Sequence, residues 1–158
     1  MIRDFEAADA PAAARVALEA WAEFERVFDG WDALAGRLAA IGSLAQELEL
    51  IVALEEGTLA GLIGYAPPGA KRDPMFRPEW AIVRLLSVAP SARARGIGRR
   101  LTEECIVRAR RDGAPAIALH TSPAMQVALP LYERLGFVRE RAIPDRFGVP
   151  YALYTLAL

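Results

Sequence analysis

The sequence predicts one domain of the mixed α/β class, in which helices flank a β-sheet. Its 158 residues are the usual size of a single domain with one hydrophobic core. With 54% apolar and 25% charged residues, the chain is too hydrophobic to be disordered. Segments with apolar residues at helical spacing alternate with short apolar runs typical of strands. We find no repeat and no second domain boundary, so we expect residues 1–158 to form one domain.

The first half of the chain predicts an edge strand, two helices and a hairpin. Residues 1–6 are a short edge strand, and Asp9 caps an amphipathic helix that runs to about residue 27. A second helical stretch covers residues 31–46. Residues 48–54 and 58–65 are predicted to pair as a hairpin around Gly57. Residues 67–78 hold four prolines, which predicts a loop.

The second half predicts strands that alternate with two helices. Residues 80–88 fit a central strand that Pro90 ends, and residues 97–111 have the i, i+4 apolar spacing of a helix. Residues 116–120 are a short buried strand. Residues 125–135 form a helix ended by Gly136. Two last strands, 137–143 and 151–158, enclose a loop that holds Pro144, Gly148 and Pro150.

The composition excludes several classes of protein. One Cys and one His cannot form an internal disulfide or a zinc site of thiolates and imidazoles, so we expect no metal. No run approaches the ~20 apolar residues that span a bilayer, and no signal-peptide stretch opens the chain. We therefore expect a cytoplasmic protein without a membrane partner.

The charge is divided unevenly along the chain. Residues 1–70 carry 4 Arg against 12 acids, whereas residues 71–158 carry 14 Arg and Lys71 against 8 acids. The basic half predicts an anionic ligand. The acidic total, the sparse Lys and the absence of aromatic residues in the basic stretch disfavour nucleic acid and favour a small phosphorylated ligand. An Arg-rich nucleic-acid-binding module is an alternative, and it predicts steeply salt-dependent affinity.

The segment from Val88 to Leu101 predicts where that anion binds. A strand that enters a helix through a glycine-containing turn leaves backbone N–H groups unpaired beside the positive end of the helix dipole. Gly96 and Gly98 let the backbone approach phosphate oxygens closely. The segment does not match the Walker pattern, because it has no Gly-Lys-Ser/Thr. It does not match the dinucleotide-binding fingerprint either, because Leu101 stands where that pattern needs a third Gly.

Two motifs together resemble a known family. Arg93-x-x-Gly96-x-Gly98 resembles the acetyl-CoA pyrophosphate loop of the GNAT N-acetyltransferases, and residues 131–137, Leu-Tyr-Glu-Arg-Leu-Gly-Phe, resemble that family's Leu-Tyr-x-x-x-Gly-Phe segment. The resemblance covers essentially the whole chain. It implies a splayed mixed sheet flanked by helices, with acetyl-CoA as cosubstrate wedged at the splay.

The resemblance also implies residue roles. The backbone N–H of Leu86 would polarise the acetyl carbonyl, and the backbone of Ser87 and Val88 would hydrogen-bond the pantetheine arm. Tyr132 would be the general acid toward the departing thiolate. An uncharged primary amine would attack acetyl-CoA directly in a ternary complex, through a tetrahedral intermediate, without a metal. The pyrophosphate would be held by Arg93, Ala94, Arg95, Gly96, Ile97, Gly98 and Arg99.

The sequence departs from the family pattern at two positions. Met125 stands where the family often has an Asn, so that hydrogen bond is missing or is replaced by Ser122 or Gln126. Ile82 stands where many members carry a Glu base. The general base is therefore unassigned, and the candidates are Glu79, His120 at a strand end, and water.

Other chemically active side chains have ordinary structural interpretations. Cys105 lies on the apolar face of its helix and is predicted to be an inert buried thiol. His120 is predicted to be structural rather than catalytic. Arg84 lies on an apolar strand, where a buried Arg usually pairs with a carboxylate such as Glu79, and substrate binding is the alternative.

The acceptor is left open. A small molecule, a peptide N-terminus and a protein Lys all fit, and the acidic N-terminal half would favour a cationic amine unless its charge is solvated helix surface. A noncatalytic acyl-CoA-binding or sensor domain is the rival function, favoured by Ile82 and opposed by Tyr132. We expect no nucleic-acid partner, and the oligomeric state is left open between monomer and homodimer.

Overall fold

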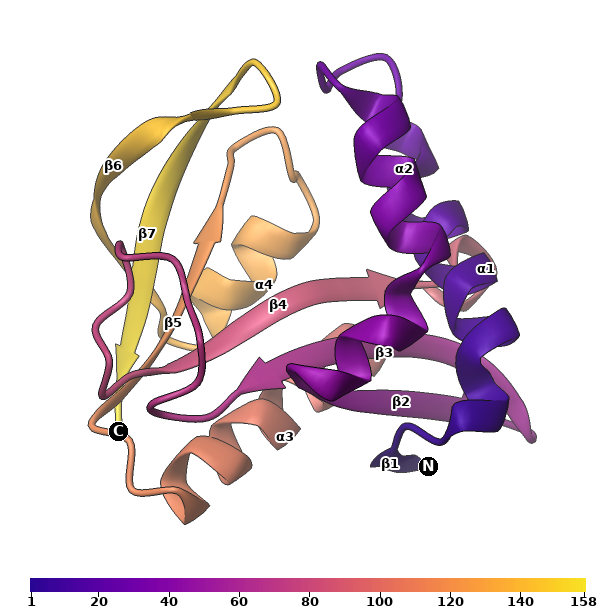
Figure 1. Ribbon diagram of the computed structural model, residues 1–158, viewed down its shortest axis with the longest axis horizontal. Helices are drawn as coiled ribbons and strands as arrows, with labels where there is room; N and C mark the ends of the chain where they lie inside the picture. The colour runs from indigo at the N-terminus through magenta and orange to yellow at the C-terminus, as the bar shows by residue number, and fades with distance from the viewer.

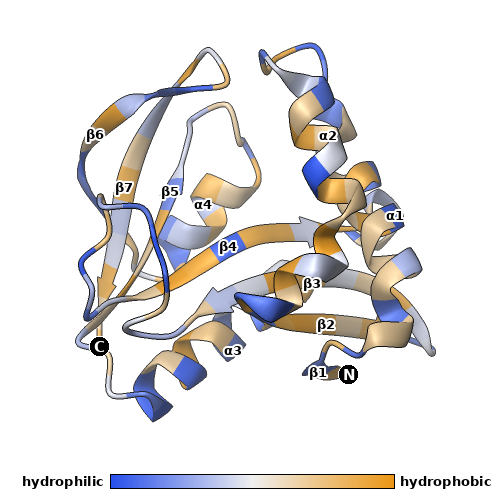
Figure 2. Ribbon diagram, in the orientation of Figure 1, coloured by the Kyte–Doolittle hydropathy of each residue, from blue (hydrophilic) through white to orange (hydrophobic).

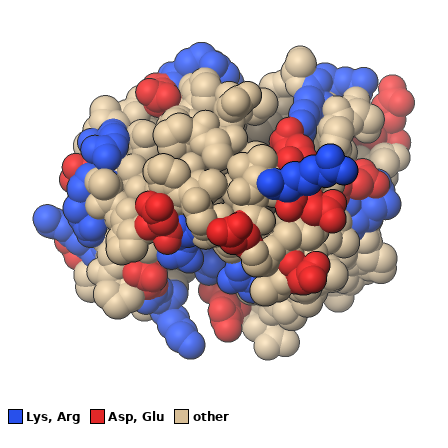
Figure 3. All heavy atoms as spheres, turned by 90° about the horizontal axis from the view of Figure 1, so that it is seen from above, with Lys and Arg blue, Asp and Glu red and all other residues tan.

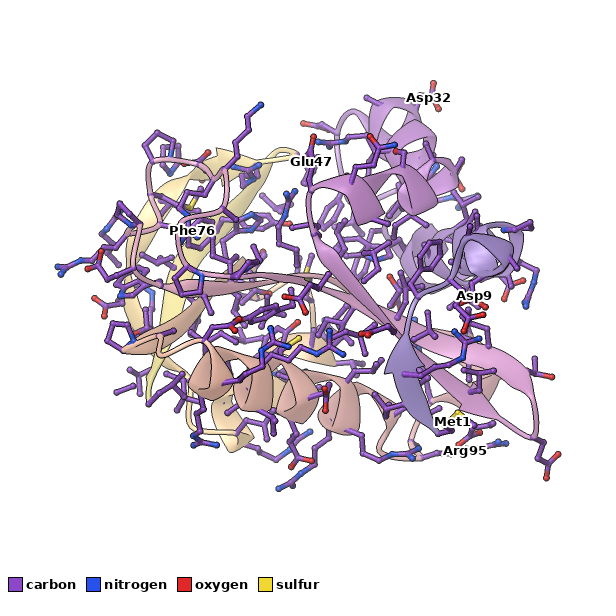
Figure 4. All side chains as sticks on the ribbon, turned by 60° about the horizontal axis from the view of Figure 1, so that its bottom comes forward. Met1, Asp9, Asp32, Glu47, Phe76 and Arg95 are labelled. Carbon is purple, nitrogen blue, oxygen red and sulfur yellow. The ribbon has the colours of Figure 1, made fainter.

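The computed structural model describes all residues from Met1 to Leu158 and shows a single mixed sheet between two layers of helices. The strand order is β1-β2-β3-β4-β5-β7-β6, and every neighbouring pair is antiparallel except β4 and β5. Helices α1 and α2 cover one face, and α3 and α4 lie on the other (Figures 1 and 4). The predicted mixed α/β class and the splayed sheet are confirmed. No helix is long and apolar enough to cross a membrane.

The elements of the first half follow the expected order. They are β1 (Ile2–Asp4), α1 (Ala10–Trp21), α2 (Trp31–Ala39), β2 (Glu49–Glu55) and β3 (Thr58–Ala66), with short 3₁₀ turns before and after α1 and a longer one, Ile41–Gln46, after α2.

The first helix begins directly after Asp9 as predicted, but its predicted side-chain cap and its predicted end were wrong. The Asp9 carboxylate does not cap α1; it accepts the Glu6 backbone N–H at 2.8 Å and two hydrogen bonds from Arg3, at 2.7 and 2.9 Å. An arginine fork satisfies both carboxylate oxygens at once, so it outcompetes the helix N–H groups. The α-helix ends at Trp21 and continues as the 3₁₀ turn Ala22–Phe24, not as helix to residue 27.

The second half contains β4 (Ala81–Val88), α3 (Ile97–Arg111), β5 (Ala116–Thr121), α4 (Ala128–Arg134), β6 (Val138–Arg146) and β7 (Val149–Ala157). Helix α4 begins three residues later than predicted. The predicted loop between the last two strands shrinks to Phe147 and Gly148. Pro144 lies in β6, the sheet edge, and Pro150 lies in β7 ahead of its pairing with β5, which begins at Ala152, so neither proline interrupts a ladder on both sides.

The sheet opens between β4 and β5. These strands pair only through Ala81 with Ile117 and Ile82 with Ala118, and they then diverge. Leu85 has a left-handed backbone, with φ of 58°, at a register shift of β4 against β3, which is a β-bulge that bends the strand. The edge of β4 beyond Ile82 therefore has no strand beside it. Figure 2 shows β4 as a largely hydrophobic strand with one hydrophilic interruption, which is Arg84.

Candidate active site

A cavity of about 460 Å³ lies at the splay, against the N-terminus of α3. Gly96, Ile97, Gly98 and Arg99 all line it, and none of their backbone N–H groups donates a hydrogen bond within the protein. Ala94 and Gly96 have left-handed backbones, with φ of 63° and 75°, which turn the chain sharply into the helix. The wall of this cavity thus presents unpaired N–H groups at the positive end of a helix dipole, which is an anion-binding arrangement.

The two glycines of this turn are needed for different reasons. Gly96 has open space where a side chain would stand, but its positive φ disfavours any other residue. Gly98 is helical, yet a Cβ there would lie 3.2 Å from Leu131 and 3.6 Å from Leu86. A side chain at position 98 would therefore both crowd α4 and fill the cavity floor.

The predicted arginines of the loop are all engaged with acids. Arg93 donates to the Ala20 carbonyl at 3.0 Å and to Glu23 at 3.1 Å, and Arg99 pairs with Glu103 at 2.8 Å; both still line the cavity. Arg95 does not line it. Its guanidinium pairs with Glu55 at 2.9 Å, at the outer edge of the molecule (Figure 4).

The end of β4 places its three predicted residues differently. Leu86 and Val88 line the cavity, whereas the Ser87 side chain is buried beneath it. The Ser87 hydroxyl donates to the Leu85 carbonyl at 3.0 Å and accepts the indole N–H of Trp21 at 3.0 Å. These two bonds fix Trp21 over the bend in the strand.

A second cavity, of about 230 Å³, adjoins the first and is lined by the β4 residues from Val83 to Leu86. Four residues line both cavities: Trp21, Leu86, Met125 and Ala128. In the space-filling view from above, a recess opens between the side formed by β6 and β7 and the side formed by α1 and α2 (Figure 3). The molecule therefore has room for two ligands whose ends meet beside Leu86.

Tyr132 lies on α4 one turn after Ala128, a residue that lines both cavities. Its side chain is 6% exposed and lines the second cavity, and its hydroxyl makes no hydrogen bond with the protein. Burial raises its pKa well above the usual value for a tyrosine. The phenol thus stays protonated at neutral pH and is able to donate to a ligand.

The remaining candidate residues have clear positions. Met125 lines both cavities, Gln126 lines the first, and Ser122 is buried and lines neither. Ile82 is 2% exposed in the core, so nothing at that position takes a proton. Cys105 is fully buried as predicted, and burial raises the pKa of its thiol.

His120 is held in an apolar environment. It stacks on Phe76 of the loop between β3 and β4 at 5.9 Å and meets the edge of Tyr151 at 5.4 Å. Burial, with a smaller contribution from Arg146 and Arg84, lowers its pKa to about 4. The imidazole is therefore neutral at pH 7 and a weak base.

The expected ion pair of Arg84 is absent. Arg84 is exposed, not buried as expected, and it makes no ion pair. Glu79 is also exposed and lines neither cavity. Sequence reasoning also missed Arg37 and Arg146, which line the second cavity with Arg84. They come from α2, β4 and β6, so no local pattern connects them.

Comparison with known proteins agrees with this geometry. Residues 14–137 match the model of the acetyltransferase (GNAT) family. The chain is 33% identical over 86 residues to N-acetyltransferase family 8 member 3 of Rattus norvegicus; the match covers 54% of this chain and 36% of that protein, so the chain spans about a third of this relative.

Solved structures share the whole fold. The ribosomal-protein-alanine N-acetyltransferase of Brucella melitensis superimposes with a TM-score of 0.76 at 23% identity, over 100% of this chain and 99% of that one. The PaiA N-acetyltransferase of Thermoplasma acidophilum, in complex with coenzyme A, gives a TM-score of 0.76 at 17% identity, over 100% and 98%. With the family model spanning most of its length, the chain belongs to the GNAT acetyltransferase family.

Proposed function

We propose that this protein is an N-acetyltransferase that uses acetyl-CoA as cosubstrate and acetylates a primary amine by direct attack. The observation that carries the proposal is the meeting of the two cavities at Leu86, with unpaired N–H groups at the far end of one and Tyr132, whose hydroxyl has no protein partner, in the wall of the other. The first cavity also fits the cosubstrate chemically. It is lined by 14 hydrophobic residues among 21, with its anion-binding end at α3.

The chain would hold acetyl-CoA by its backbone more than by its side chains. The N–H groups of Gly96, Ile97, Gly98 and Arg99 would bind the pyrophosphate, with Arg93 adding charge beside them. Ala94 lines the same wall, while Arg95 would act only through the loop, since it pairs with Glu55. The unpaired edge of β4 at Ser87 and Val88 would receive the pantetheine arm as an added strand does.

The cosubstrate supplies an activated acetyl thioester, and the chain would position the acceptor against it. The Leu86 N–H would polarise the acetyl carbonyl. As the amine forms the C–N bond and the C–S bond breaks, Tyr132 would give its proton to the leaving thiolate and recover it from solvent. The amine's own proton would leave through water, since Ile82 offers no base and His120 is a weak one.

Thermal unfolding tests the binding half of the proposal. A ligand that binds only the native state adds about 2.7 kcal/mol at a hundredfold excess over its dissociation constant. For a domain of this size, that shift is on the order of 5–10 °C. Acetyl-CoA should raise the melting temperature of cofactor-free protein, and Gly98→Glu should remove the rise, because it places a carboxylate at the pyrophosphate end and crowds Leu131.

A matched control is Gly57→Glu, at a turn with open space around it and no cavity nearby. It should keep the acetyl-CoA shift. No shift in the unaltered protein would refute the family-based assignment of the ligand. A normal shift without acetyl transfer to any amine would instead support the noncatalytic acyl-CoA-binding alternative.

A further inference from the structure

Three arginines line the second cavity without an acid to pair with. Arg37, Arg84 and Arg146 make no ion pair and no side-chain hydrogen bond, and no Asp or Glu lines this cavity. Of the three, only Arg37 makes a cation–π contact, with its guanidinium carbon 5.9 Å from the centre of the Phe147 ring. By contrast, the arginines that line the first cavity include Arg93 and Arg99, each paired with an acid.

The cavity wall carries positive charge that no lining acid offsets; Arg37 and Arg84 are exposed and Arg146 is half-buried. The pKa of Arg84 is lowered, first by burial and then by repulsion from Arg146 and Arg37. The one acid whose charge opposes this effect is Glu47, which is exposed, lies near the centre of the view in Figure 4 and does not line the cavity. An anion bound among the three guanidinium groups would relieve this repulsion.

Two polar atoms in the cavity wall are buried with no partner. They are the Nε of Arg146 and the Nδ1 of His120. Buried donors and acceptors are satisfied in the great majority of cases, and each exception asks for an explanation. Both residues line this cavity, so polar groups that the protein leaves without a partner lie directly behind its wall.

The rest of the wall is apolar and closed on one side. Fourteen of the 20 lining residues are hydrophobic. Phe147, at the tip between β6 and β7, stacks its ring on Phe28 at 5.2 Å, and its backbone carbonyl accepts the N–H of Asp29 at 2.9 Å. The tip therefore bridges to the α1–α2 connection, which favours a small free acceptor over a side chain on a folded protein.

We infer that the acceptor is an amine that also carries a carboxylate, of the class of apolar α-amino acids. This inference rests on the proposed transferase function. The guanidinium groups of Arg84 and Arg146 would bind the carboxylate through paired N–H donors, and the apolar wall would receive the side chain. The α-amine would then face Leu86 and Tyr132. The N-terminal half lines this cavity through residues such as Trp21 and Arg37 but through none of its acids, so its charge gives no support to a cationic acceptor.

Matched acceptors test the inference. We compare L-phenylalanine with 2-phenylethylamine and L-leucine with 3-methylbutylamine, following the release of CoA thiol. A carboxylate in charge-assisted hydrogen bonds is worth about 1.5–3 kcal/mol, so kcat/KM should be about 10 to 100-fold higher for each amino acid than for its decarboxylated partner.

Amine basicity needs its own control, since a decarboxylated amine is more protonated at neutral pH. L-phenylalaninamide has a neutral group in place of the carboxylate and a less basic amine than phenylalanine. It should still be the poorer acceptor. Equal use of the amide and the acid, or a preference for polyamines, would overturn the inference.

Variants of the cavity arginines test whether these residues cause the preference for the carboxylate. Arg84→Met and Arg146→Met should each bring the ratio of kcat/KM between phenylalanine and 2-phenylethylamine toward one. Arg110→Met is the control, because Arg110 is exposed, makes no ion pair and lines neither cavity. A ratio that stays high in both cavity variants would remove the carboxylate from this site.

Binding separates this inference from the proposed function. With CoA present, calorimetry compares N-acetyl-L-phenylalanine with N-(2-phenylethyl)acetamide. If no amine releases CoA, the transferase function fails, yet tighter binding of the acid that is lost in Arg84→Met would still support the anion site. No preference for the acid in this binding experiment would refute it whether or not turnover is seen.

Discussion

Two buried tyrosines offer a test of catalysis that is independent of folding. The Tyr132 hydroxyl has no protein partner, whereas the Tyr65 hydroxyl donates to Asp112 at 2.7 Å and its ring is fully buried. Tyr132→Phe removes a polar atom that no hydrogen bond offsets, so the free energy of unfolding should stay within about 1 kcal/mol or rise. Tyr65→Phe breaks a bond to a charged acceptor and should cost about 1–3 kcal/mol.

The two variants should rank the other way in turnover: Tyr132→Phe should slow acetyl transfer, and Tyr65→Phe should not. If Tyr132 protonates the leaving thiolate, its loss should slow acetyl transfer by about 10²-fold or more, with little change in acetyl-CoA binding. Tyr65 lines neither cavity, so Tyr65→Phe should keep the wild-type rate at a temperature where it is folded. The assays are single-turnover CoA release, so that chemistry limits the rate, and urea unfolding.

The pH dependence adds a further constraint. Because burial raises the pKa of Tyr132 above that of a free tyrosine, the phenol keeps its proton throughout the range below pH 10. The rate should then climb with pH toward the pKa of the acceptor amine. A Tyr132→Phe rate within a few fold of wild type, under chemistry-limiting conditions, would make Tyr132 a packing residue.

The remaining predictions concern the proton path, acid stability and the hairpin tip. Glu79→Gln and His120→Ala should each keep turnover within about tenfold; a thousandfold drop in either, with acetyl-CoA binding preserved, would reveal a dedicated base. The lowered pKa of His120 means that the unfolded chain takes up a proton first as pH falls. The native state should therefore lose up to about 2–3 kcal/mol between pH 6.5 and 4 in denaturant titrations, a loss absent in His120→Gln. Gly148→Ala should lower the free energy of unfolding by about 1–2 kcal/mol, because its Cβ would collide with the Asp29 carboxylate. Gly57→Ala, at a similar φ but with open space around it, should lower the free energy of unfolding by less. An equal loss in the two variants would show that the Asp29 side chain moves aside at little cost.

Local patterns in the sequence predict most of the elements of this fold. Helix α3 begins and ends at the predicted residues because its apolar spacing, its preceding Gly96 and its closing Asp112-Gly113 agree. The error at Asp9 arose from a competitor, Arg3, whose reach to that carboxylate depends on where β1 lies.

The site was predictable only where it is local. The turn at Gly96 and the segment around Tyr132 are continuous in sequence, and the structure brings both to the cavities. The bulge at Leu85 has no sequence signal, since leucine rarely takes a left-handed backbone. The grouping of Arg37 and Arg146 with Arg84 requires three distant elements to pack first.

The narrow junction between β4 and β5 also bears on how the domain moves. Two residue pairs join a four-stranded sheet, β1 to β4, to a three-stranded sheet made of β5, β7 and β6. Each part has its own ladder of hydrogen bonds, so amide exchange can reveal them as separate cooperative units. A ligand in the first cavity touches β4 on one side and α4 on the other, and so links the two units. Ligand binding at this site and the rigidity of the whole domain are therefore thermodynamically coupled, so each favours the other.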